Sequence, residues 1–308
     1  MLNYSAHPSL VDEIIAHAAT SDLRTYAALR LCSRAARDVA DAHVLRHVEL
    51  TEDCAGLHPP RGFSPRLPRR SGPGDYLPFA PQHVRVLDID WDDRYAAGHH
   101  DDDLEKLTSV TTMRRLADGR ENFDTPTYLR IPAPTLVDFI RPYARSSPIV
   151  FDPVVRRYVL HLTWTPKLGS RAQFARLAFS AHSLREVVLV LRPDGHRWTP
   201  DEEYRSLPEF LPDALRLGFD VVKRGGTLTV VGGELVHPLQ LGGSATDARW
   251  KTDLCERVVW GLWRDGGYND GAERIRVLRV VDWWRELGAR KEIEGVWPEA
   301  EEQSEEQS

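Results

Sequence analysis

Cysteine and long apolar runs are scarce in this chain of 308 residues. Its three cysteines, Cys32, Cys54 and Cys255, are odd in number and widely spaced, which argues against a disulfide framework and a zinc ribbon. The clearest apolar run, residues 187–191, is far shorter than the roughly 20 residues that a membrane helix needs. The N-terminus also lacks the pattern of a signal peptide. We therefore expect a cytoplasmic or nuclear protein that has no contact with a membrane.

An excess of basic charge is missing as well. The net charge is −6, and residues 299–308 carry five glutamates and no basic residue, so removing them leaves a charge of −1. A nearly neutral body has no electrostatic footprint for nucleic acid or for an anionic membrane, and we expect neither as a partner. An acidic segment rich in Gln and Ser buries too little apolar surface to fold, so residues 299–308 are predicted to be a disordered tail.

Sequence patterns of catalysis are also absent. The chain contains no GxGxxG, no GxxxxGK[ST] and no GxSxG motif. Residues 99–103, His-His-Asp-Asp-Asp, are the densest set of metal-ligating side chains. Adjacent residues seldom converge on one ion, and we interpret the run as the start of a helix, where acidic side chains are favoured. We therefore predict no catalytic residues, no metal and no cofactor.

Composition divides the chain into successive parts. Residues 5–50 have helical periodicity and form the first predicted domain. Residues 51–81 are predicted to be a Pro/Gly-rich linker or loop, since residues 54–81 hold seven prolines and four glycines. Residues 82–298 alternate β-type runs with helical patterns, which predicts a mainly parallel sheet. The predicted strands are residues 84–89, 128–131, 158–163, 187–191, 228–231 and 275–281, and the predicted helices include residues 135–143, 172–179 and 214–223.

The first part reads as three short helices. A capping box at residues 9–12 precedes the first helix, and further helical patterns cover residues 23–31 and 33–42. About forty residues make a poor independent core, and no metal or disulfide supports this one. We therefore expect its exposed apolar side chains to meet another surface. That surface is either another protein or the rest of this chain, with the helices forming a cap on it.

The order of residues in these helices resembles an F-box. Residues 7–15, His-Pro-Ser-Leu-Val-Asp-Glu-Ile-Ile, are similar to the F-box opening. Residues 29–40, in which an apolar pair precedes Cys-Ser-Arg, are similar to the later F-box segment, and residues 45–50 to its end. The resemblance implies docking on a Skp-type adaptor and, through it, on a cullin. The adaptor-binding residues that it implies are Pro8, Leu10, Val11, Ile14, Ile15, Leu29, Leu31 and Cys32.

The second part has a weaker resemblance to leucine-rich repeats. Residues 84–89, 184–189 and 275–280 have an LxxLxL character, without the asparagine ladder of regular repeats. The expected fold class is therefore α+β or α/β, with a small N-terminal three-helix F-box followed by a βα-repeat, leucine-rich-repeat-like scaffold. A compact α/β domain is the alternative. Trp91, Trp164 and Trp283 lie at or just after predicted strands, where aromatic side chains can anchor a target protein or can equally close the end of a sheet.

Together these features predict a non-catalytic substrate-receptor subunit of a Skp–cullin–F-box ubiquitin ligase. The N-terminal helices would bind the adaptor, and residues 82–298 would hold a target protein of unknown identity, which raises its effective concentration at the ligase. Two alternatives remain open. One is a non-catalytic scaffold that binds the adaptor outside a ligase, and the other is an unrelated α/β enzyme.

Overall fold

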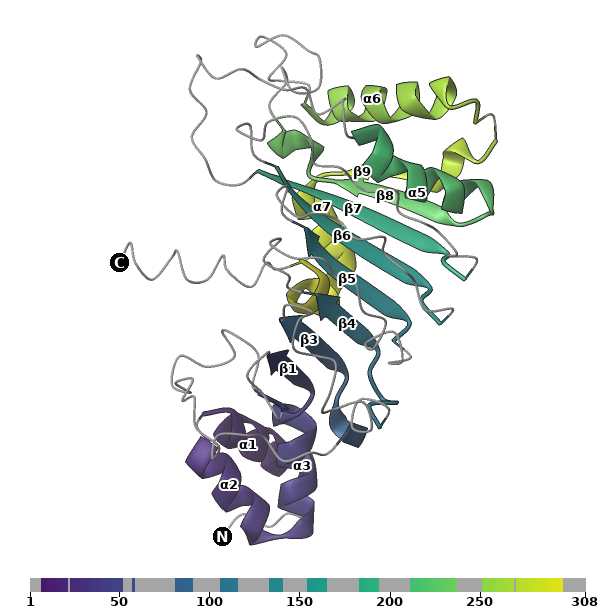
Figure 1. The fold of residues 1–308 in the computed structure, drawn as a ribbon. Coiled ribbons are helices and arrows are strands. Elements are labelled where there is room, and N and C mark those ends of the chain that lie inside the picture. The colour runs from purple at the N-terminus through teal and green to yellow at the C-terminus, as the bar shows by residue number, and fades with distance from the viewer. Residues whose placement is uncertain are drawn as a thin grey trace.

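A long sheet with helices at both ends forms the body of the protein (Figure 1). Three helices lie at the N-terminal end, and from β1 onward the strands follow in chain order, apart from β2 at the edge beside β1. The computed structural model describes residues 7–21, 23–51, 57–58, 81–90, 106–115, 133–140, 154–164, 183–193, 211–236, 251–268 and 270–295.

The three N-terminal helices pack against one another. They are α1 (Pro8–Ser21), α2 (Leu23–Cys32) and α3 (Arg34–Val44). Ser33 precedes α3, and its Oγ accepts a hydrogen bond from the N–H of Ala36 at 3.0 Å. This bond satisfies one of the donors that the first turn of a helix leaves without a partner. Ala19, Tyr26 and Ala40 are buried in the common core.

A sheet of nine strands follows, in the order β2-β1-β3-β4-β5-β6-β7-β8-β9. The short β2 is antiparallel to β1, and all other neighbouring strands are parallel. The bounds are β1 (His47–Thr51), β2 (Leu57–His58), β3 (Val86–Asp90), β4 (Thr112–Arg115), β5 (Thr135–Ile140), β6 (Arg157–Trp164), β7 (Glu186–Pro193), β8 (Thr227–Val231) and β9 (Ile275–Leu278).

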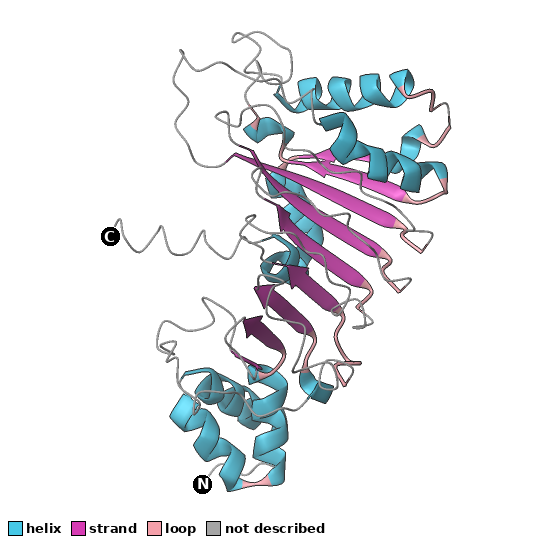
Figure 2. Cartoon of the chain, viewed as in Figure 1, coloured by secondary structure: helices cyan, strands magenta, loops and turns pink. Residues whose placement is uncertain are grey.

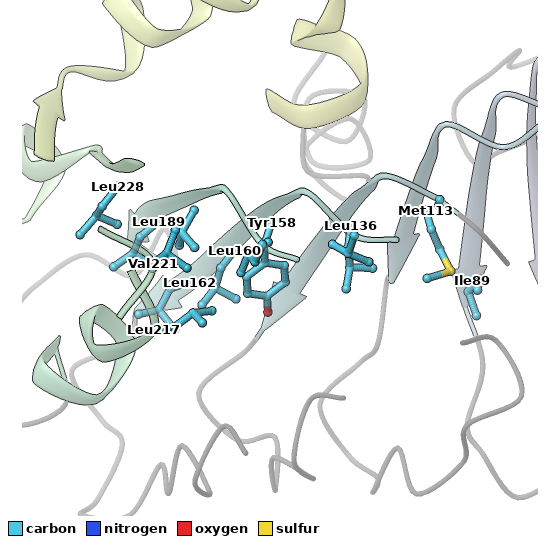
Figure 3. Close-up of a cluster of buried hydrophobic side chains, with 14 of the residues drawn as sticks. Ile89, Met113, Leu136, Tyr158, Leu160, Leu162, Leu189, Leu217, Val221 and Leu228 are labelled. Atoms are coloured by element: carbon cyan, nitrogen blue, oxygen red, sulfur yellow. The ribbon is translucent and has the colours of Figure 1, made fainter. Parts of the chain in front are cut away.

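Helices cover both faces of the C-terminal half of the sheet (Figure 2). On one face, α5 (Leu211–Lys223) and α6 (Lys251–Asp265) contribute to the larger core. Figure 3 shows a row of its side chains, which runs from Ile89 through Leu136 and Leu160 to Leu228. On the other face, α7 (Val280–Leu287) packs Trp283 and Leu287 on a second, smaller core. Short helical turns complete the fold: η1 (Pro81–His83), η4 (Gly233–Leu235), η7 (Ala272–Arg274), η8 (Gly288–Arg290) and the π-helical turn η9 (Lys291–Gly295).

The predicted fold class, a three-helix F-box followed by a leucine-rich-repeat-like scaffold, is wrong. Residues 45–50 were assigned to the end of the helical module, but residues 47–51 form β1, which pairs with β3 along its whole length. The sheet is therefore continuous with the N-terminal helices. In the described ranges, helices between successive strands occur only after β7, and α7 crosses the face opposite to α5 and α6. A repeat that places each helix on the same face does not fit this arrangement, which is α/β.

Individual elements differ from prediction in two instructive places. Residues 135–143 were predicted as a helix because Leu136, Phe139 and Ile140 have helical spacing, but residues 135–140 form β5. Both faces of β5 are covered, so its apolar residues need not alternate with polar ones. Residues 275–281 were predicted as one strand, but β9 ends at Leu278 and α7 begins at Val280. The predicted elements at 128–131 and 172–179 lie outside the described residues.

Within the described residues, no helix has the length and apolar character to cross a membrane.

Candidate protein-docking surface

Helices α1 and α2 carry exposed large apolar side chains. Across the described residues, six large apolar side chains are exposed, and three of them, Leu10, Ile14 and Leu31, belong to these two helices. Leu10 and Ile14 are 46% and 45% exposed, and Leu31 is 89% exposed. Leu10 and Ile14 are four residues apart and therefore share one face of α1. We call Leu10, Ile14 and Leu31 the apolar surface.

The predicted adaptor-binding residues divide into two groups in the structure. Pro8, Leu10, Ile14, Leu31 and Cys32 are exposed. The other three, Val11, Ile15 and Leu29, are half-buried, and Ile15 and Leu29 pack against the main core. The helical periodicity could not separate the two groups, because the sequence does not reveal which apolar side of a helix faces its own chain.

A buried carboxylate fixes α2 relative to α3. Oη of Tyr26 donates to Oδ1 of Asp41 at 2.7 Å, and Nε of Arg30 lies 2.9 Å from the same oxygen. The guanidinium of Arg30 also lies 5.7 Å from the ring centroid of Tyr26. Burial, followed by the hydrogen bond to Asp41, raises the pKa of Tyr26 well above its usual value. These contacts hold the helix that carries Leu31 in one orientation.

Charged side chains pair across neighbouring strands at the N-terminal end of the sheet. Oδ1 of Asp88 on β3 lies 2.9 Å from Nε2 of His47 on β1 and 3.1 Å from Nε of Arg114 on β4. The guanidinium of Arg114 lies 5.4 Å from the centroid of the Phe139 ring on β5. Asp88 and Arg114 are both buried, whereas His47 is half-buried. Asp88 thus contacts both the buried guanidinium of Arg114 and the partly accessible imidazole of His47.

A second buried group lies on the other face of the sheet, between β4 and β6. Nε and Nη2 of Arg115 both donate to the carboxylate of Asp138, which is 2% exposed. Oη of Tyr158 donates to the same carboxylate at 2.7 Å. Burial and the negative charge of Asp138 raise the pKa of Tyr158 well above its usual value.

A third group joins the C-terminal turn η9 to β6. The carboxylate of Glu294, which is 2% exposed, accepts hydrogen bonds from Nε and Nη2 of Arg157 at 3.0 and 2.7 Å. Nε2 of His161 donates to the backbone carbonyl oxygen of Glu294 at 2.5 Å. Arg157 also forms an ion pair with Glu186 on β7. Burial, with the charge of Arg192, lowers the pKa of His161 well below its usual value.

Of the three predicted target-binding tryptophans, Trp283 is the one whose side chain the structure describes. Trp283 on α7 is 2% exposed, and its ring centroid lies 6.1 Å from that of His161. It is therefore part of the smaller core and is not accessible to a partner in this structure. Trp164 ends β6, and its side chain lies outside the described residues, as does the whole of Trp91.

The sequence reasoning missed the charged groups inside the sheet. A signal for them was present, since His161 interrupts the apolar pattern of the predicted strand 158–163 and Arg157 directly precedes that strand. Their partner Glu294, however, is 137 residues away from Arg157, a separation at which spacing carries no information. Within the described ranges, no group of three or more His, Cys, Asp or Glu side chains is arranged to hold a metal ion.

Comparisons with known proteins give little guidance. No family model matches the chain, and no curated protein matches it either. Among solved structures, the chain is similar to dihydropteroate synthase from Thermus thermophilus in complex with 6HMPPP. That similarity has a TM-score of 0.23 and 16% sequence identity, and it covers 70% of this chain and 85% of that chain. A TM-score this low carries no argument about fold or activity.

Proposed function

We propose that this chain is a non-catalytic docking protein that binds a Skp-type adaptor through the apolar surface of α1 and α2. The exposure of Leu10, Ile14 and Leu31 is the observation that carries the proposal. The same three residues belong to the set that the F-box resemblance implies. An apolar side chain as exposed as Leu31 gains free energy when another surface covers it.

The expected energetics are sufficient for a specific contact. Full burial of a leucine contributes about 1.5–3 kcal/mol. Leu31 is almost fully exposed, so nearly all of this gain remains for an interface, and Leu10 and Ile14 each retain close to half of it. A loss of about 1.4 kcal/mol weakens binding tenfold. Replacement of Leu31 alone is therefore expected to weaken adaptor binding by roughly tenfold or more.

The test is co-purification of the full chain with its Skp-type adaptor, comparing wild type with Leu31→Asp. A charge buried at an interface without a partner is strongly unfavourable, so Leu31→Asp should abolish recovery of the adaptor. Leu235→Asp is the matched control, because Leu235 is 42% exposed but lies in η4, at the other end of the sheet. Circular dichroism confirms that both variants are folded. Equal recovery with both variants would remove the basis of the proposal.

The finer proposal is that the adaptor connects this chain to a cullin, as a substrate receptor of a ubiquitin ligase. Detection of a cullin in the same purification supports the ligase role. Recovery of the adaptor without a cullin supports a scaffold outside a ligase. In both cases the chain contributes binding and no catalytic residue.

An α/β enzyme is the second candidate, favoured by the contacts of Asp88. A buried carboxylate that contacts a half-buried imidazole, His47, is an arrangement that active sites use for proton transfer. This candidate predicts that His47→Gln removes an activity while leaving adaptor recovery unchanged. The docking proposal predicts that His47→Gln leaves adaptor recovery and target recovery unchanged.

A further inference from the structure

The C-terminal turns η8 and η9 are held on the sheet mainly by polar contacts. The carboxylate of Glu294 accepts two hydrogen bonds from Arg157, and its other oxygen lies 3.3 Å from Nη1 of Arg290. The carbonyl of Glu294 accepts from His161. In a π-helical turn the backbone hydrogen bonds are shifted by one residue relative to an α-helix, and such turns are frequent at functional sites. The turn thus presents both the carboxylate and the carbonyl of one residue to the sheet.

The preceding helix is attached in a different way. Trp283 and Leu287 of α7 are buried in the smaller core with Val137, Val159 and Val188 of the sheet. Gly288 follows directly, with φ 54° and ψ −122°, a conformation that residues with a side chain rarely adopt. Apolar contacts thus hold α7 on the sheet, and polar contacts hold residues 289–295. Gly288, which lies between these two segments, can act as a hinge. Movement of residues 288–295 about Gly288 would leave α7 in place.

A carboxylate from another molecule could replace that of Glu294 in the contact with Arg157. Opening the turn without a replacement would leave Arg157 with Glu186 as its one remaining carboxylate partner in the described residues. A carboxylate from another molecule would restore the same charge-assisted, two-donor contact. Arg157 and His161 lie with Val159 on one side of β6, and Glu186, Val190 and Arg192 lie on the same side of β7, so this face offers two guanidinium groups and an imidazole donor against one carboxylate.

We propose that residues 288–295 are a latch that covers a carboxylate-binding site on β6, and that an acidic peptide of a partner protein takes the place of Glu294. The site is built from Arg157, which binds the side-chain carboxylate, and His161, which binds a backbone carbonyl of the same residue. The peptide therefore carries a Glu or Asp in an extended or turn conformation. The site is separate from the apolar surface and does not depend on the adaptor.

The test uses a fluorescent synthetic peptide with the sequence of residues 288–295 as the probe for the site. The full chain with Glu294→Gln has lost the charge that closes the latch, and it is expected to bind this peptide at least tenfold more tightly than wild type. A peptide in which the glutamate at the position of Glu294 is replaced by Gln should bind the Glu294→Gln chain at least tenfold more weakly than the original peptide does. Adding Arg157→Gln to the Glu294→Gln chain should remove binding of the original peptide.

Two results would overturn the proposal. In the first, Glu294→Gln lowers the melting temperature without any gain in peptide affinity, as a purely structural contact would. In the second, hydrogen exchange of wild-type protein shows residues 289–295 as protected as residues 281–287, which leaves no opening for a latch. The second measurement needs no variant. Binding of short DNA or of inorganic phosphate in preference to the peptide would likewise exclude an acidic peptide as the occupant. Recovery of the adaptor in the same variants shows whether the docking proposal stands or fails separately.

Discussion

Replacement of Asp138 by alanine is expected to remove about 3–5 kcal/mol from the free energy of unfolding. The side chain of Asp138 is almost completely buried and accepts hydrogen bonds from two nitrogens of Arg115 and from Oη of Tyr158. Arg115 is itself 6% exposed, so the substitution removes a charged partner from a guanidinium in the protein interior. Since a domain is stable by about 5–15 kcal/mol, this loss is a large fraction of the total.

The expected loss in the free energy of unfolding can be divided between the two partners of Asp138, Tyr158 and Arg115. Tyr158→Phe removes one hydrogen bond to a charged acceptor, which is worth about 1.5–3 kcal/mol. The remainder of the loss in Asp138→Ala comes from the ion pair between Asp138 and the buried guanidinium of Arg115. The double replacement Arg115→Met with Asp138→Leu removes both charges and fills the space with apolar atoms. It should therefore be more stable than Asp138→Ala, although it also loses the hydrogen bond from Tyr158 and so remains less stable than wild type.

Urea unfolding followed by circular dichroism measures these differences, provided that the slope m is the same in each variant. Asp38→Ala is the control, because Asp38 is exposed on α3 and its loss should change stability by less than about 0.5 kcal/mol. The reasoning is refuted if Asp138→Ala costs less than about 1 kcal/mol, or if the double replacement is no more stable than Asp138→Ala. The second result would mean that the loss of the ion pair between Arg115 and Asp138 is not the source of the destabilisation.

Two further predictions follow from the shifted pKa values. Because burial and Arg192 lower the pKa of His161, the unfolded chain takes up a proton before the folded one, so stability should fall as the pH drops below about 6.5. In urea unfolding at pH 7.5 and 5.5, His161→Gln should lose less stability than wild type, and an equal loss would contradict this assignment. Burial raises the pKa of the Cys255 thiol to about 12, whereas Cys32 is exposed. Iodoacetamide at pH 8 should modify Cys32 in the folded protein and Cys255 only after unfolding, as mass spectrometry of the peptides would show.

The sequence predicted the C-terminal strands well and the central ones poorly. Residues 158–163, 187–191 and 228–231 were expected as strands, and β6, β7 and β8 contain them. These runs are rich in β-branched residues and have turn residues on their flanks. In contrast, β4 is the sequence Thr-Met-Arg-Arg, which has no apolar pattern at all. It is a strand because its two arginines find carboxylates on the neighbouring strands, which only the tertiary structure provides.

For the apolar surface, the sequence likewise predicted one part correctly and could not predict the other. Helical spacing in residues 7–32 placed Leu10, Ile14 and Leu31 on helices, and the structure has these helices. The same spacing applied equally to Ile15 and Leu29, which turn towards the main core. Which side of a short helix faces its own chain depends on α3 and β1, and local periodicity contains no information about them. Adaptor binding itself remains a prediction that the co-purification tests.

Ion pairs between neighbouring strands help to fix the register of this sheet. Residues 187–191 of β7 are apolar and buried on both faces, so a slip by one residue would exchange one apolar face for another at little cost. Apolar alternation therefore cannot fix the register here. Direct partners in the observed register are Asp88 and Arg114, Arg115 and Asp138, and Arg157 and Glu186.

The two residues of each set form an ion pair. Each ion pair joins two different neighbouring strands: β3 and β4, β4 and β5, and β6 and β7. A slip by one residue would separate the charges at that junction and turn one partner to the opposite face. For Asp88 with Arg114 and for Arg115 with Asp138 this would separate two buried opposite charges, which costs about 3–5 kcal/mol for each pair. A buried ion pair gives little net stability compared with well-packed apolar residues, so its repetition along the sheet is better explained by specificity. We interpret these charges as the features that align a sheet whose apolar residues do not specify one alignment.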